Sequence, residues 1–243
     1  MNKRWEILPI DEKKQILLEK NLHISSSLAE ILTRKNLDEN SAKLFLNPTK
    51  ISYHDPFLLK DMEKACQRLL LALKNKEKIC IYGDYDVDGV SSTALLMTVF
   101  TKLGFNIDYY LPDRHSEGYG LHIESLQKLI PKYDLLITVD CGITALDEVD
   151  YAKDKIDMII TDHHLPREIL PDAFAIINPT QTQCNYPNKN LCGVGVAFKL
   201  CQGLYQSLNK DIHELENYLD IVALGTIADI VPLVDENRRI VKK

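Results

Sequence analysis

Short apolar runs alternate with amphipathic segments through residues 76–243. Continuous apolar runs are typical of buried parallel strands, and apolar positions at helical spacing predict helices. Strands separated by helices predict a doubly wound, mainly parallel α/β sheet flanked by helices. The expected strands are 79–82, 107–111, 135–139, 158–160 and 175–177. The expected helices are one from Val90 onward, 123–130, 146–152, 194–205 and 215–228.

Residues 1–75 show helical patterning without strands. Ser27 and Glu30 have the spacing of a capping box, and Asp38 is expected to cap the helix that follows it. We therefore expect an N-terminal helical extension ahead of an α/β domain that covers 76–243. The amphipathic segments of the extension are 11–20, 28–34 and 61–74.

Composition limits the class of protein. The 243 residues are 45% hydrophobic, which is enough for a large core. The formal net charge of −6 gives no basic footprint for nucleic acid, although an acidic metal site would contribute to that deficit. There is no signal-peptide pattern and no membrane-spanning run, so a soluble cytoplasmic protein is expected. The six cysteines have no C-x-x-C spacing and are expected to be reduced and buried.

The most informative stretch is the acidic turn after the strand at 79–82. Asp84, Asp86 and Asp88 lie within five residues there. Two carboxylates about 4 Å apart repel by about 4 kcal/mol at an effective dielectric of about 20. A divalent cation relieves this repulsion; an exposed turn in which Asp88 caps the next helix is the alternative. A calcium loop of the EF-hand type is excluded, because Leu95 occupies the position where its glutamate is needed.

Acidic and imidazole groups recur where apolar strands end. Asp140 follows the strand at 135–139, and Asp162, His163 and His164 follow the strand at 158–160. Because parallel strands bring their carboxyl ends to one edge of a sheet, we expect these groups to meet the acidic turn there. Asp229, in an otherwise apolar stretch, is a further candidate, since a buried carboxylate needs a cation or access to solvent.

Carboxylates combined with imidazole suit Mn²⁺ or Mg²⁺ better than structural zinc. Asp140, on the central strand, is expected to bridge two ions roughly 3.5–4 Å apart, which would activate a water and neutralise phosphoryl charge. We assign His163 to metal and His164 to phosphate contact, because successive residues of an extended chain project differently. A hydrogen-bonded imidazole without metal remains the alternative for His163.

Three residues are weaker candidates for substrate contact. Gly195 lies near the start of the helix at 194–205, where amide groups can bind a phosphate, although tight packing explains a glycine equally well. Arg114 is expected to hold a phosphate or to pair with Glu117. Tyr119 is a candidate for stacking on a base.

The segments GDYDVDG, VDCG, TDHH and GTIADIVPL resemble, in order and spacing, the four motifs of the DHH phosphoesterase superfamily. The flanking segments HDPFLLKDMEKA, LPDRHSEGYGL and LCGVGVAFKL resemble RecJ-like single-strand-specific exonucleases. The resemblance implies metal ligands at Asp84, Asp86, Asp140, His163 and Asp229, and a phosphate contact at His164.

The resemblance also implies an activity: 5′→3′ removal of nucleotides from single-stranded DNA, in recombination and repair. It suggests a single-strand-binding protein and a helicase as partners. Two alternatives stay open. One is a phosphodiesterase of the same superfamily for short oligonucleotides or cyclic dinucleotides. The other is a non-catalytic scaffold in a replication or repair complex.

Two departures from the family pattern matter. Cys80 stands where many superfamily members have a metal-binding histidine, so one firmly held ion and one weaker ion are expected. RecJ-like enzymes continue into further domains, whereas this chain stops at RRIVKK. A fragment without its C-terminal partner domains is therefore expected.

Overall fold

The computed structural model describes residue 6 and residues 9–243, and the chain divides into two units between Ser52 and Tyr53. The first unit is helical. Its small core consists of Leu18, Ala29, Leu32 and Ala42. Its elements are α1 (Glu12–Leu22), α2 (Ser26–Arg34), α3 (Glu39–Leu46) and the 3-10 helix η1 (Pro48–Lys50).

Side-chain caps start the helices of this first unit. Asp38 accepts a hydrogen bond from the backbone N–H of Ser41, as expected. The cap of α2 is Ser25, whose hydroxyl accepts from the N–H of Leu28. The expected capping box at Ser27 is therefore wrong by two positions, because Ser27 already lies in the first helical turn.

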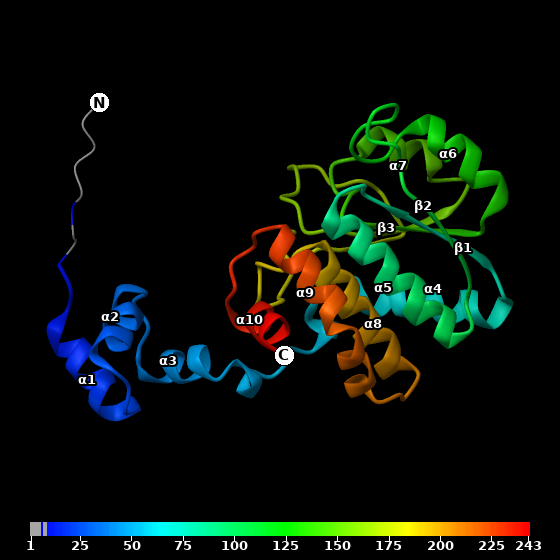
Figure 1. Cartoon of the computed structure of the whole chain (residues 1–243). Coiled ribbons are helices and arrows are strands. Elements are labelled where there is room, and N and C mark those ends of the chain that lie inside the picture. Colours follow the sequence, from blue (N-terminus) through cyan, green and yellow to red (C-terminus); the bar gives the residue numbers. More distant parts are fainter. Residues whose placement is uncertain (1–5, 7–8) are drawn as a thin grey trace. The chain divides into compact units, whose positions relative to one another are not determined.

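The second unit is built on a five-stranded sheet of order β2-β1-β3-β4-β5, and every pairing is parallel. Figure 1 shows helices on both sides of this sheet. This confirms the predicted α/β class. The strands are β1 (Lys78–Gly83), β2 (Asn106–Tyr110), β3 (Leu135–Val139), β4 (Asp157–Thr161) and β5 (Ala175–Ile177). The helices are η2 (Pro56–Leu58), α4 (Met62–Asn75), α5 (Val87–Leu103), α6 (Ile123–Leu129), η3 (Ile130–Lys132), α7 (Leu146–Ala152), α8 (Gly193–Ser207), η4 (Ile212–Tyr218), α9 (Leu219–Ala228) and α10 (Asp235–Lys242).

Two apolar clusters cover the two faces of the sheet. Successive strand side chains point to opposite faces, so Ile79 and Ile81 join one cluster and Cys80 and Tyr82 join the other. Helices α4, α5 and α8 cover the first face, and α6 and α7 cover the second. Helices on both faces leave the carboxyl edge of the sheet as the place for a site.

The structure differs from the expected elements in three places. The chain divides near residue 52, not near 75, because apolar side chains of α4 join the core of the sheet. Residues 212–218 form a 3-10 helix, so α9 starts later than expected. Helix α10 was not expected from the sequence at all. Among the described residues, no helix combines the length and the apolar character that crossing a membrane requires.

A buried ion pair holds α10. The Lys199 ammonium on α8 lies 2.8 Å from the carboxylate of Glu236, and both side chains are almost fully buried. Glu236 also accepts hydrogen bonds from the Tyr186 hydroxyl and the His54 backbone N–H. Burial lowers the pKa of Lys199, and the Glu236 carboxylate opposes that effect.

We expect Lys199→Met to destabilise the fold by about 3–5 kcal/mol, because it leaves the Glu236 carboxylate buried without a cation. Urea unfolding measures this loss. The matched control is Lys102→Met, which breaks an exposed pair with Glu214 and should leave the free energy of unfolding nearly unchanged. Equal losses in the two variants would contradict a structural role for the buried pair.

Candidate metal centre

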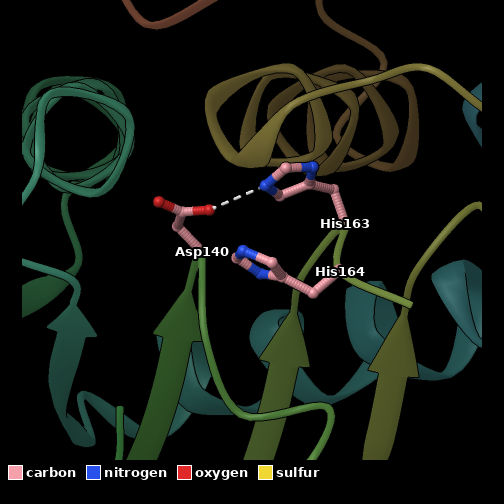
Figure 2. Close-up of side chains that lie close together, drawn as sticks. All are labelled: Asp140, His163 and His164. Atoms are coloured by element: carbon pink, nitrogen blue, oxygen red, sulfur yellow. Dashed lines mark ion pairs between the residues drawn. The ribbon is translucent and has the colours of Figure 1, made fainter. Parts of the chain in front are cut away.

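Parallel register places three aspartates at the same level of the sheet. Gly83 pairs with Val139, and Val139 pairs with Thr161. Each of these residues ends its strand, and the next residue in each case is an aspartate: Asp84, Asp140 and Asp162. The expected convergence at the carboxyl edge is therefore present, and Figure 2 shows the strands pointing toward Asp140 and the two histidines.

Asp140 lies at the centre of this edge. Its backbone adopts a left-handed conformation, with φ of 60°, directly after β3, and such strained positions concentrate at functional sites. Its Oδ1 lies 3.1 Å from Nε2 of His163, which points toward it from the end of β4 (Figure 2). Nε2 of His163 also lies 3.7 Å from a carboxylate oxygen of Asp229 and 3.8 Å from one of Asp88.

Three overlapping groups offer ligand atoms that lie within 4.8 Å of one another. Asp140 and His163 each belong to two groups, so a position shared between two ions is available at both. Asp84 and Asp88 are buried, Asp86 is exposed, and His163, His164 and Asp229 are half-buried. The groups are Asp84, Asp86 and Asp140; Asp140, His163 and His164; and Asp88, His163 and Asp229.

The ligand atoms themselves indicate that a cation belongs here. Oδ1 of Asp84, Oδ1 of Asp140 and Nε2 of His163 are buried without a hydrogen-bond partner. Buried polar atoms in native proteins are nearly always paired, so orphaned atoms that converge on one point need an explanation. Asp84 and His163 belong to different ligand groups and Asp140 shares a group with each, so divalent cations at these groups would satisfy the three atoms. Carboxylates with one imidazole suit Mn²⁺ or Mg²⁺.

Burial and mutual repulsion shift the acids away from their ordinary behaviour. Burial, followed by the charges of Asp88 and Asp86, raises the pKa of Asp140 to about 10. Burial likewise raises the pKa of Asp84 and of Asp229. Carboxylates that resist ionisation become good ligands once a cation supplies the missing positive charge.

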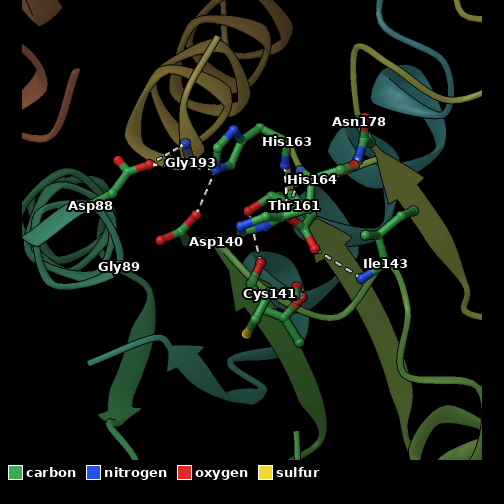
Figure 3. A network of polar contacts seen from close by, with 12 residues as sticks. Asp88, Gly89, Asp140, Cys141, Ile143, Thr161, His163, His164, Asn178 and Gly193 are labelled. Atoms are coloured by element: carbon green, nitrogen blue, oxygen red, sulfur yellow. Dashed lines mark hydrogen bonds and ion pairs between the residues drawn. The ribbon is translucent and has the colours of Figure 1, made fainter. Parts of the chain in front are cut away.

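His164 is held by a different partner. Oδ1 of the buried Asp162 lies 2.7 Å from Nδ1 of His164, and this bond is the main reason that the pKa of His164 rises to about 9. Asp162 also accepts from the backbone N–H groups of Ile143 and His164. His164 therefore projects toward the site as a cation, which is the form that contacts a phosphate (Figure 3).

Asp88 is a residue whose place the sequence did not reveal. Its carboxylate is buried and accepts from the backbone N–H groups of Gly193 and Val194, at 2.6 and 2.8 Å, at the start of α8 (Figure 3). The alternative in which Asp88 caps the following helix is wrong, because Asp86 caps α5 by accepting from the Gly89 N–H. The partners of Asp88 lie more than a hundred residues away, so no local signal identifies them.

Two glycines at the start of α8 have different surroundings. A Cβ at Gly193 would lie 2.6 Å from the Cβ of Asp140, so only glycine lets the helix approach the central acid. Gly195 is buried against Leu191. Because the first amide groups of α8 already bind Asp88, the geometry adds no support to the predicted phosphate contact at Gly195.

The loop between β2 and α6 carries the other weaker candidates. Arg114 lies over the ring of Tyr85, with its guanidinium carbon 5.4 Å from the ring centroid. The alternative pairing of Arg114 with Glu117 is wrong, because Glu117 accepts hydrogen bonds from the hydroxyls of Tyr110 and Ser125. Arg114 is exposed, and its planar fork remains available for a phosphate.

Every cysteine of the chain is buried, as the sequence predicted. Cys80 lies inside β1 among the apolar side chains that α6 and α7 cover, away from the acids at the end of the strand. Cys141 follows Asp140 but belongs to the same apolar cluster. Both are therefore packing residues.

We expect the metal-free protein to lose stability as pH rises from about 4 to about 10. Its Asp140 carboxyl has a pKa raised above the unfolded value of 3.8, so ionisation disfavours the folded state throughout that interval. Asp140→Asn keeps the shape without the charge and should raise the free energy of unfolding in chelator, by on the order of a few kcal/mol.

Thermal unfolding with chelator and with Mn²⁺ measures both effects. Mn²⁺ should raise the Tm of the unaltered chain and leave that of Asp140→Asn nearly unchanged. If chelator-treated Asp140→Asn were less stable than the unaltered chain at neutral pH, the proposed repulsion would be wrong.

Comparison with known proteins agrees with this geometry. The sequence pattern of the DHH family, N-terminal domain, matches residues 78–226. The single-stranded-DNA-specific exonuclease RecJ of Bacillus subtilis is 45% identical over 98% of this chain and 30% of its own length. RecJ of Escherichia coli is 44% identical over 75% of this chain and 33% of its own length.

Solved structures give the same result. A structure of RecJ from Thermus thermophilus in complex with Mn²⁺ superposes with a TM-score of 0.82 at 28% identity, covering 98% of this chain and 34% of that one. A structure of exonuclease RecJ bound to manganese gives 0.70 at 36% identity, covering 76% and 47%. The chain spans about a third of the length of the curated relatives that it matches. On this sequence match and this fold, the chain belongs to the DHH family.

Proposed function

We propose that this chain hydrolyses phosphodiester bonds of single-stranded DNA with Mn²⁺ or Mg²⁺ as cofactor, as a 5′→3′ exonuclease in recombination and repair. The observation that carries the proposal is that buried ligand atoms of Asp84, Asp140 and His163, which make no hydrogen bond, gather at one sheet edge. The relatives named single-stranded-DNA-specific exonucleases support the choice of substrate.

The proposed ligands come from four segments of the chain. Asp84 and Asp86 come from the turn after β1, Asp140 from the end of β3, His163 from the end of β4, and Asp229 from the end of α9. Asp140 would be shared between two ions, because it belongs to two of the ligand groups and, unlike His163, offers two carboxylate oxygens. When bound there, the cation supplies Lewis-acid stabilisation of phosphoryl charge and lowers the pKa of a water.

Two side chains of the protein are proposed to orient the phosphate. His164 is held by Asp162 through Nδ1, which fixes the direction of its other ring nitrogen and keeps the ring protonated. Arg114, exposed above Tyr85, offers a planar fork for a second phosphate contact. Gly195 stays a prediction without support from the geometry.

The alternatives from the sequence find less support. A scaffold would not need to keep every acid of the centre, and all of them are present and close together. A phosphodiesterase for short oligonucleotides or cyclic dinucleotides would use the same centre, and the relatives named single-stranded-DNA-specific exonucleases count against it. The partners suggested by the resemblance, a single-strand-binding protein and a helicase, stay predictions, as does the cytoplasmic location.

We expect Asp140→Ala to reduce hydrolysis of a 5′-phosphorylated single-stranded oligonucleotide to below about 1%, with either Mn²⁺ or Mg²⁺. Loss of a residue that only orients a metal ligand costs up to about 100-fold, and loss of a bridging ligand removes more. An end-label assay measures the rate, with Glu124→Gln, an exposed acid on α6, as the control. Near-normal turnover of Asp140→Ala would refute the bridging role.

The same assay tests the substrate class. We expect the unaltered chain to degrade a long single strand and to leave the matching duplex intact, and the position of the label reports polarity. Faster turnover of a dinucleotide than of the long strand would instead favour the short-substrate alternative. Absence of both turnover and Mn²⁺ binding in calorimetry would favour the scaffold.

A further inference from the structure

A cleft adjoins the metal centre on the side of Tyr119. It has a volume of about 360 Å³ and is bordered by Tyr119, by the loop that starts at Gly142, by the first turn of α7 and by Arg167. Its volume lies in the range of small-ligand sites. Gly142 borders the cleft and follows Asp140 by two residues, so the cleft lies next to the central acid along the chain.

Tyr119 is shared between the cleft and the metal centre. Its hydroxyl lies 3.3 Å from Nδ1 of His164 and 3.4 Å from the backbone oxygen of Asp140. Its ring meets the ring of His164 edge-on, with 5.9 Å between the centroids. About half of Tyr119 is exposed, so the side chain is anchored at the catalytic edge and still offers ring surface to a ligand.

The loop that carries Tyr119 is built to hold its shape. Gly118 and Gly120, on either side of Tyr119, both have positive φ, at 80° and 89°, which other residues rarely adopt. Glu117 ties the loop to β2 and α6 through the hydroxyls of Tyr110 and Ser125. A platform fixed before binding loses less entropy when a ligand arrives.

Charge decides which part of a substrate suits this cleft. Asp147 and Glu148 border it, and Arg167 is the only cation among the described residues that do. Two carboxylates against one guanidinium disfavour a phosphate. They suit an uncharged nucleobase, whose face stacks on an aromatic ring.

We propose that this cleft is a nucleobase subsite, in which the Tyr119 ring stacks on a base of one of the two nucleotides that flank the phosphodiester at the metal centre. The subsite presupposes the hydrolysis of single-stranded DNA proposed above. It holds the base by its face, which every base has, so it takes a nucleotide without selecting a sequence. The neighbouring His164 and the cations would contact the phosphate, while the cleft holds the base.

Oligonucleotides with an abasic unit on one or the other side of the scissile phosphate test this subsite. For one of the two positions, we expect kcat/KM to fall about tenfold relative to the base-bearing strand, the size typical of a lost stacking contact. In Tyr119→Ala the ratio between the two substrates should fall to about one, whereas Tyr119→Phe, which keeps the ring, should retain it. Loss of the hydroxyl alone then measures the effect of Tyr119 on His164 separately.

Equal kcat/KM of the unaltered chain on base-bearing and abasic strands at both positions would overturn the subsite and leave the proposed hydrolysis intact. A ratio that persists in Tyr119→Ala would also overturn it. If the chain cleaves neither strand, the proposed hydrolysis fails, and fluorescence anisotropy of the same strands with Mn²⁺ then tests the subsite separately. The subsite requires that the unaltered chain and Tyr119→Phe bind the base-bearing strand more tightly than the abasic strand. Tyr119→Ala should bind the two strands equally, and any other result overturns the subsite.

Discussion

The repulsion among carboxylates at the carboxyl edge of the sheet is the constraint on which the rest of the structure depends. Parallel register sets Asp84, Asp140 and Asp162 side by side, and the apolar clusters behind them keep that edge poorly solvated. A poorly solvated site has a low effective dielectric, which strengthens both the repulsion between like charges and the attraction of a cation. The site that the backbone forms in advance thus lowers the folding stability of the metal-free protein, and cation binding would offset that loss.

Polar contacts between distant segments hold that edge together. Asp88 ties the acidic turn to the start of α8 through two amide groups, where the helix dipole also favours its negative charge. Gly193 then lets the same helix approach Asp140. Further along α8, the buried Lys199–Glu236 pair fixes α10, which follows the segment that carries Asp229. One helix therefore positions ligands that come from both ends of the domain.

The charge distribution divides recognition of the substrate between two kinds of contact. The chain carries a net charge of −6, and the centre itself is a cluster of acids. In the proposed function, phosphate recognition at the centre would depend on bound cations, on His164 and on Arg114, and contacts elsewhere would be made to sugar and base. The rigid ring of Tyr119 provides such a contact without adding charge. A site of this kind accepts any base, which is what degradation of a strand from its end requires.

The sequence by itself determined the strands, most of the helices and the acids that end the strands, because these depend on local periodicity and on polar residues at fixed places in each βα unit. It also identified Asp140 and His163 as neighbours, since parallel strands bring their carboxyl ends together. Only the tertiary structure decided that Asp88 binds α8, that Glu117 binds Tyr110 and leaves Arg114 above Tyr85, and that Lys199 fixes α10. In each case the partner is the side chain or backbone group that the fold places within contact distance, and it belongs to a separate element. The spacing of residues along the chain does not encode that proximity.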